Sequence, residues 1–203
     1  YPLRRQRQMC IRDSYAHDWR LRQSIAAHIP ALIPTMLLGD EDGCLITLSL
    51  LALNDPVNAL RNIGIQCVPI TYRTFREHDE TIADGFLSML CDMAHASTSR
   101  QRTTFLNIVQ SLLEHDLSRD RFERLILPCL LELAADGVSD VNIALARTVQ
   151  QVWLLGWYNN ETMPAALRQV VATLFIAPTL TVQEFMQSLD PVSYTHLTLP
   201  TKR

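Results

Sequence analysis

The feature that most constrains the fold is a pattern that repeats along the chain. The segments DPVNALR (Asp55 to Arg61) and DGVSDVN (Asp136 to Asn142) align position by position. Two further marks are Arg22 in DWRLR and Arg102 in SRQR, so that equivalent residues stand at the evenly spaced positions 22, 61, 102 and 142. A period of about 40 residues is typical of arrays in which each structural unit packs against its neighbours.

Between these marks, apolar residues recur with helical spacing. They follow i, i+3, i+4 and i+7, and no segment of comparable length alternates as a strand does. Four such stripes are Val57, Leu60, Gly64, Cys67 and Val68; Ile82, Phe86, Leu90 and Met93; Phe105, Ile108, Val109 and Leu112; and Phe122, Leu125, Ile126, Cys129, Leu130 and Leu133. The sequence therefore predicts an all-α chain with helices near 18–36, 44–54, 55–75, 79–96, 99–115, 119–135, 139–157 and 161–177, and a further helix after Thr181.

Capping residues and helix breakers set the predicted boundaries. Asp55 can accept hydrogen bonds from a first helical turn and Pro56 suits the next position, so a helix is expected to begin there. Asn160 ahead of Pro164 marks another start, and the GDEDG run at Gly39 to Gly43 is a predicted turn. Four prolines within helical stretches predict bends, because each removes one backbone hydrogen bond: Pro30, Pro34, Pro69 and Pro128.

The two ends of the chain are related through the genetic code. Arg4 to Ser14 reads RRQRQMCIRDS, and the reverse complement of one DNA string that encodes it translates to PVSYTHLTLPT, the sequence from Pro191 to Thr201. Folding gives no reason for such a relation, whereas a DNA library does, and the string resembles a transposon-end sequencing adapter. We therefore expect residues 1–14 and 191–203 to be adapter-derived, and residues 15–190 to be a fragment truncated at both ends.

Setting the ends aside changes the charge of the chain. Of 18 basic residues six lie in the ends, and of 21 acidic residues one does, so residues 15–190 have a net charge near −8 rather than −3. A negative balance argues against nonspecific nucleic-acid binding and is compatible with a protein partner. No run approaches the roughly 20 apolar residues of a membrane span. We therefore expect a soluble protein that binds neither nucleic acid nor membrane.

Residues that could carry chemistry do not form a recognisable motif. Four cysteines lack CxxC pairing and lie in apolar helical patterns, which favours buried free thiols in a reducing compartment: Cys44, Cys67, Cys91 and Cys129. The EHDE run at 77–80 and the EHD run at 114–116 are expected to be solvated helix ends, since adjacent side chains point in different directions. The sequence contains neither GxSxG nor a glycine-rich phosphate loop. We expect no catalytic site, no metal and no cofactor.

The paired helices, the Asp–Pro–Val turn and the arginine six residues after the aspartate resemble the HEAT repeat. Four segments are similar to the scaffold and regulatory subunits of protein phosphatases 2A and 4: RTTFLNIVQSLLE, FERLILPCLLELAADGVSDVN, IALARTVQQV and DWRLRQSIAAHIPALI. The resemblance covers about residues 15–158 and implies an α-α superhelix, a solenoid of about four repeats. Asn142 stands where the pattern has arginine, so the ladder of Asp and Arg that the family has between repeats is expected to be interrupted there.

This resemblance implies a non-catalytic scaffold or regulatory subunit of the cytoplasm or nucleus. Its partners would be the catalytic subunit of a serine/threonine phosphatase and a further regulatory subunit, bound through the turn that joins the two helices of each repeat. The matching turn residues are Trp19 and Arg20; Asn54 and Asp55; Ser99 and Arg100; and Ser139 and Asp140. Trp19 and Arg100 are the expected hot spots, because charged rim contacts are usually worth little singly.

Two other classes of function compete with this interpretation. A HEAT-repeat transport receptor or chromosome-organising adaptor would share the fold and bind other proteins. Further repeats that continue the Trp–Arg–x–Arg and DPVxxVR pattern would favour the phosphatase scaffold over this adaptor. An enzyme would require a pocket with convergent titratable groups, which the turns of a helical repeat rarely provide.

Overall fold

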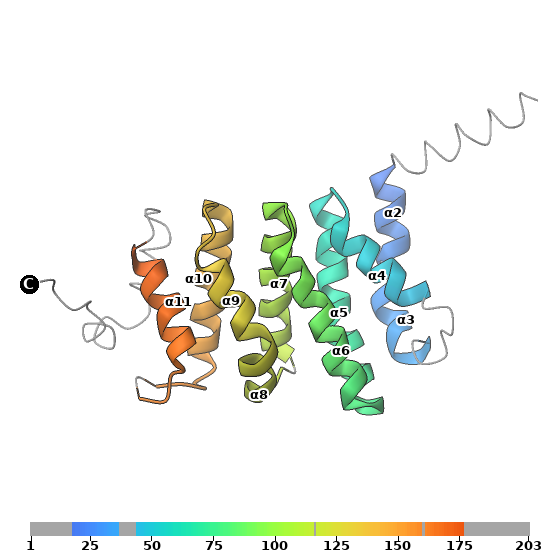
Figure 1. Ribbon diagram of the computed structural model, residues 1–203. Helices are drawn as coiled ribbons and strands as arrows, with labels where there is room; N and C mark the ends of the chain where they lie inside the picture. Colours follow the sequence, from blue (N-terminus) through green and yellow to red (C-terminus); the bar gives the residue numbers. More distant parts are fainter. Residues whose placement is uncertain (1–17, 37–43, 116, 160, 177–203) are drawn as a thin grey trace, which may run out of the picture. The chain divides into compact units, whose positions relative to one another are not determined.

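The computed structural model describes residues 18–36, 44–115, 117–159 and 161–176, which are all-helical and include no strand. The chain divides into two compact units, residues 1–83 and 84–203. Figure 1 shows the helices within each unit packed against one another. The adapter-like ends, the GDEDG turn and the helix expected after Thr181 lie outside the described residues.

The first unit is built around one long helix. α5 (Asn58–His78) packs against α3 (Ile29–Met36) and α4 (Cys44–Asn54), and α2 (Trp19–Ala26) contacts α4 and α5. Most of the apolar stripe predicted on α5 is buried, at Leu60, Gly64, Cys67 and Val68. The predicted helices of this region therefore exist, and their shared face forms the core of the unit.

Three helix boundaries predicted in this unit are wrong, one of them the end of α5, which lies at His78 rather than at 75. The stretch 18–36 is two helices: α2 ends at Ala26, and α3 begins at Ile29, one residue before Pro30. Proline has no N–H to donate and is tolerated in the first turn of a new helix. α5 begins at 58 rather than 55, because the Asp55 carboxylate accepts a hydrogen bond from the Val57 nitrogen (2.8 Å) and holds the preceding residues in a turn.

One glycine determines how closely α4 and α5 approach. A Cβ atom at Gly64 would lie 2.8 Å from the backbone nitrogen of Leu53 on α4. Backbone cannot yield as a flexible side chain can, so a larger residue would push the two helices apart. The glycine in the predicted stripe thus has a packing role that periodicity does not reveal.

The second unit is arranged around two neighbouring helices, α7 (Ser99–His115) and α10 (Ser139–Leu154). α9 (Leu127–Leu133) packs on α10, as Figure 1 shows, and α11 (Ala165–Ile176) packs on both. α6 (Glu80–Cys91) leads into the 3₁₀ turn η2 (Asp92–His95), which contacts α7 and α9. Four residues of the stripe predicted on α7 are at most 1% exposed: Phe105, Ile108, Val109 and Leu112.

The helix predicted over 119–135 changes its winding before its proline. A single turn, α8 (Arg119–Arg121), is followed by the π-helical turn η3 (Phe122–Ile126), and α9 begins at Leu127. Pro128 lies in the first turn of α9 and has no N–H to bond back to η3. The bend expected at Pro128 is therefore found as a widened turn just before it.

Three smaller expectations also differ from the structure. Ile82 is 43% exposed, so the stripe on α6 begins only at Phe86. α11 begins at 165 rather than 161, because the Asn159 side chain accepts hydrogen bonds from the nitrogens of Glu161 and Thr162 and holds them in a turn. α10 ends at 154, and Gly156 follows with a φ of 66°, a conformation that glycine adopts at little cost.

Candidate functional site

The starts of α5, α7 and α10 share one kind of hydrogen bond. In all three, a side chain donates to the carbonyl oxygen of the residue six positions earlier, which fixes the turn before the helix. The three bonds join Arg61 to Asp55 (2.9 Å), Arg102 to Ala96 (2.8 Å) and Asn142 to Asp136 (3.2 Å). The period seen in the sequence is thus a repeated local geometry.

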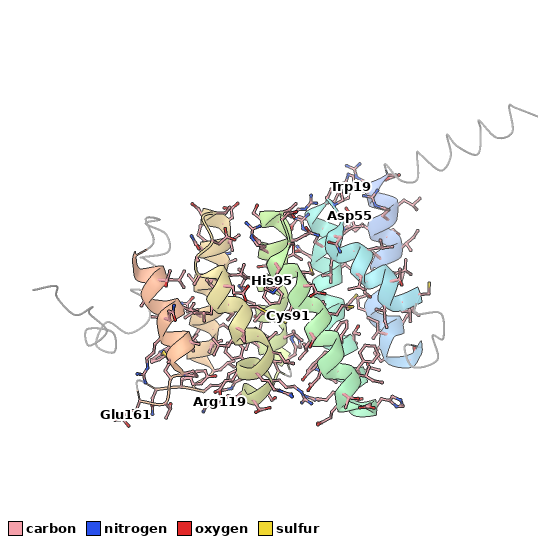
Figure 2. All side chains as sticks on the ribbon, viewed as in Figure 1. Trp19, Asp55, Cys91, His95, Arg119 and Glu161 are labelled. Carbon is pink, nitrogen blue, oxygen red and sulfur yellow. The ribbon has the colours of Figure 1, made fainter. Side chains whose placement is uncertain are left out.

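In the first unit, the turn residues Trp19 and Arg20 lie at the start of α2. The Asp18 carboxylate caps this helix by accepting from the nitrogens of Arg20 (3.0 Å) and Leu21 (3.3 Å). The exposed Arg20 guanidinium stacks over the half-buried Trp19 ring, 4.8 Å from its centre. Figure 2 shows Trp19 and Asp55 at the same end of this unit. The pair forms an aromatic and cationic surface that a protein partner could contact.

Asp55 differs from the other turn residues because its carboxylate is already engaged. Arg22 donates to it through Nε (3.1 Å) and Nη2 (3.3 Å), and the Val57 nitrogen donates at 2.8 Å. The Asp55 side chain is 11% exposed. Asn54, at the end of α4, is exposed, and its side chain donates to the Leu50 carbonyl oxygen. Asp55 therefore serves the fold, while Asn54 remains accessible.

The second unit repeats the arrangement at Asp136. Arg102 donates to this carboxylate through Nε (2.6 Å) and Nη2 (3.3 Å), and the Val138 nitrogen donates at 2.9 Å. The turn before α7 has Ala96 at the corresponding position and lacks the carboxylate. There, the Thr98 hydroxyl accepts from the nitrogen of Gln101 and donates to its side-chain oxygen (2.7 Å), which caps α7 instead.

The remaining predicted contact residues of the second unit lie on the surface. Ser99 is half-buried at the start of α7, and Arg100 is exposed. The Arg100 side chain forms no ion pair with the residues that the structure describes. Ser139 and Asp140 are exposed in the first turn of α10, where a negative charge is favourable next to the free N–H groups. These two turns thus present one cationic and one anionic group.

Sequence reasoning missed an ion triad in the second unit. Asp84 on α6 accepts from Arg121 Nε and Arg124 Nη2, both at 2.6 Å. Desolvation alone would raise the pKa of Asp84, but the hydrogen bonds from both arginines hold it below its usual range. The arginines follow Asp84 by close to one repeat length, which is the signal that could have paired them.

A second missed cluster lies between α8 and the segment after α10. Arg119 donates to Glu123 (2.8 Å) and to the Trp157 carbonyl oxygen (2.9 Å), and it stacks over the Tyr158 ring at 4.5 Å. The Tyr158 hydroxyl donates to Glu123 (3.0 Å). The hydrogen bond from Arg119 lowers the pKa of Glu123, while burial raises that of Tyr158. Every charge in this cluster is engaged, so we assign it to packing.

The cysteines are not uniformly buried, contrary to the prediction. Cys67 and Cys129 are buried, Cys91 is half-buried and Cys44 is exposed. Burial raises the pKa of the Cys67 thiol to about 11. The acidic runs behave as expected, since residues 77–80 and both Glu114 and His115 are exposed, and residue 116 lies outside the described residues. Within the described ranges, no three His, Cys, Asp or Glu side chains gather as a metal site.

Neither membrane-spanning helices nor known relatives add to the description of the site. Among the described helices, none is long and apolar enough to cross a membrane. No protein-family model matches the sequence, and a search of curated proteins finds no match.

Proposed function

We propose that this chain is part of a non-catalytic HEAT-repeat scaffold that binds the catalytic subunit of a serine/threonine phosphatase through its intra-repeat turns. The observation that carries the proposal is the recurrence of one set of bonds in both units. An arginine in the first half of a helix holds a carboxylate about one period later: Arg22 of α2 holds Asp55, 33 residues on, and Arg102 of α7 holds Asp136, 34 residues on.

The accessible residues beside these bonds support a binding role. The structural carboxylates are engaged with arginines, whereas Trp19 with Arg20 and, in the other unit, Arg100 and Asp140 face solvent wholly or in part. An aromatic ring and arginines are the residue types that contribute most at protein interfaces. The phosphatase itself comes from the resemblance of the helical segments to the scaffold subunits.

The test is binding of a purified protein phosphatase 2A or 4 catalytic subunit to the immobilised chain. The double variant Trp19→Ala and Arg100→Ala is expected to raise the Kd by about tenfold or more, since each hot spot contributes on the order of 1 kcal/mol. Arg73→Ala is the matched control, because Arg73 is exposed on α5 outside the turns. Circular dichroism of all three proteins verifies that helicity is unchanged.

The outcomes separate the function from the contact residues. If neither catalytic subunit binds the unaltered chain, the phosphatase function is withdrawn. If the double variant binds as tightly as the unaltered chain, the turn residues are not the contact surface. An equal loss with Arg73→Ala would show that overall charge, rather than these turns, determines binding.

A further inference from the structure

Two cysteines from different helices meet inside the second unit. Cys91 is the last residue of α6, and Cys129 lies on α9, far from it in the sequence. Both sulfur atoms approach the carbonyl oxygen of Leu125, Cys91 Sγ at 3.5 Å and Cys129 Sγ at 3.7 Å. Cys129 is 6% exposed, whereas Cys91 is half-buried, so Cys91 is the member of the pair nearer to solvent.

The backbone around this pair is irregular. Leu125 lies in the π-helical turn η3, and Pro128 follows within the first turn of α9. A widened turn offers its carbonyl oxygens to side chains more readily than a regular helix does, and π-helical turns frequently occur at functional sites. The shared Leu125 carbonyl thus positions two thiols that the sequence keeps far apart.

Charged groups from two elements, η2 and α9, lie near the pair. His95 of η2 bonds Glu132 of α9 at 3.0 Å and also faces Cys129, while Asp92 of η2 faces Cys91. Figure 2 shows Cys91 and His95 close together. The hydrogen bond from the Cys91 thiol lowers the pKa of Cys129 to about 7 and, with burial, raises that of Cys91. Of the two sulfurs, Cys129 is therefore the one whose thiolate form is favoured.

We propose that Cys91 and Cys129 form a peroxide-sensitive dithiol site that closes to an intramolecular disulfide between α6 and α9. The Cys129 thiolate attacks one oxygen of hydrogen peroxide, breaks the O–O bond, and becomes a sulfenic acid, while hydroxide leaves and takes up a proton. The sulfur of Cys91 then attacks the Cys129 sulfur. The S–S bond forms, and the sulfenic hydroxyl leaves as water with the Cys91 proton, so that two electrons pass from two thiols to one peroxide.

Peptide mapping of the full chain tests this site without any variant. Trypsin cuts after arginine, so Cys91 and Cys129 fall in separate peptides, residues 77–100 and 125–147, which contain no other cysteine. Brief treatment of the reduced chain with stoichiometric peroxide, followed by alkylation, is expected to yield these two peptides joined by a disulfide. Cys67, in the peptide 62–73, is the internal control and is expected to oxidise on the order of tenfold more slowly.

Variants then separate chemistry from folding. Cys129→Ser is expected to abolish peroxide consumption by the site, Cys91→Ser to stop the reaction at the Cys129 sulfenic acid, which dimedone traps, and Cys67→Ser to change neither. His95→Gln is expected to slow the first step several-fold. Recovery of Cys129 as sulfinic acid with Cys91 still alkylated would overturn the proposal. So would a disulfide that joins either cysteine to another partner, or oxidation no faster than that of Cys67.

Discussion

The turns at Asp55 and Asp136 use the same bonds but differ in how well those bonds are shielded from water. In both, the carboxylate accepts from the nitrogen two residues later and from an arginine 33 or 34 residues earlier, on α2 or α7. The Arg22 and Asp55 side chains are 29% and 11% exposed, whereas Arg102 and Asp136 are 17% and 8% exposed. Removing the arginine should therefore lower the free energy of unfolding more in the second unit than in the first, because the carboxylate left behind is better buried.

The residue six positions after each carboxylate differs as well. Arg61 donates to the Asp55 and Pro56 carbonyl oxygens and to Asn58, while the Asn142 side chain donates, among the described residues, to the Asp136 carbonyl oxygen alone. Arg102 makes both kinds of bond: it donates to the Ala96 carbonyl oxygen of the turn before α7 and to the Asp136 carboxylate of the turn before α10. Asn142 retains the bond to the carbonyl oxygen of its own turn, and its amide carries no positive charge with which to pair a carboxylate.

The largest effect is expected from Arg102→Ala. Loss of the ion pair leaves the Asp136 carboxylate buried, and we expect the second unit to lose about 3 kcal/mol of its free energy of unfolding. Hydrogen exchange of α10 amides, followed by mass spectrometry, measures this loss within the unit. Arg102→Asn refines the test, because it can retain the bond to Ala96 and so isolates the ion pair. A change below about 1 kcal/mol would place this pair with ordinary surface pairs.

The next effect belongs to the first unit and to packing rather than charge. Gly64→Ala is expected to destabilise this unit by about 2 kcal/mol, since the new Cβ would press on the Leu53 backbone. Gly85→Ala on α6 is the matched control, because a Cβ there meets nothing within 4 Å. In the helix interior this control should gain up to about 1 kcal/mol. Urea denaturation followed by circular dichroism measures both, and a loss of equal size in both variants would remove the role assigned to close packing.

A smaller loss is expected for Arg22→Ala. The pair with Asp55 is more exposed than its counterpart, so we expect about 1 kcal/mol, read from the hydrogen exchange of α5 amides. If Arg22→Ala costs as much as Arg102→Ala, burial does not explain the difference between the two turns.

The smallest effect is expected for Asn142→Ala. The substitution removes one hydrogen bond to Asp136, but it also removes the buried Oδ1 atom of Asn142, which accepts no hydrogen bond from the described residues. These changes oppose each other, and we expect less than about 1 kcal/mol in either direction in the same exchange experiment. A loss comparable to that of Arg102→Ala would show that the bond to the carbonyl oxygen, which both residues make, contributes more than the ion pair, which only Arg102 of the two makes.

The sequence predicted the helices where periodicity and capping agree. The segments 44–54 and 99–115 match α4 and α7 at both ends, because a polar turn or cap bounds each apolar stripe. The absence of a carboxylate at Ala96 was also readable, since ASTSRQR aligns with DPVNALR. The all-helical class followed from the same local rules.

Features that depend on how two helices meet were not predictable in this way. Cys91 and Cys129 appear isolated in the sequence, and the contacts of α6 and η2 with η3 and α9 bring them together. The engagement of Asp55 by Arg22 was likewise not readable from spacing, and it gives this predicted contact residue a role within the fold as well. The winding of η3 depends on the balance between Pro128 and the core positions on either side, which one-dimensional spacing does not encode.

The π-helical turn also affects how this protein can change length during evolution. A π-helical turn holds about one residue more than an α-helical turn, and η3 lies between Arg102 and Asp136. A deletion of one residue in 122–126 can relax into regular helix and still bring Asp136 to Arg102. The same deletion early in α7 would rotate the following positions by about 100°. Relatives that vary in length are therefore expected to do so at η3, where the π-helical turn contains one residue more than an α-helical turn would.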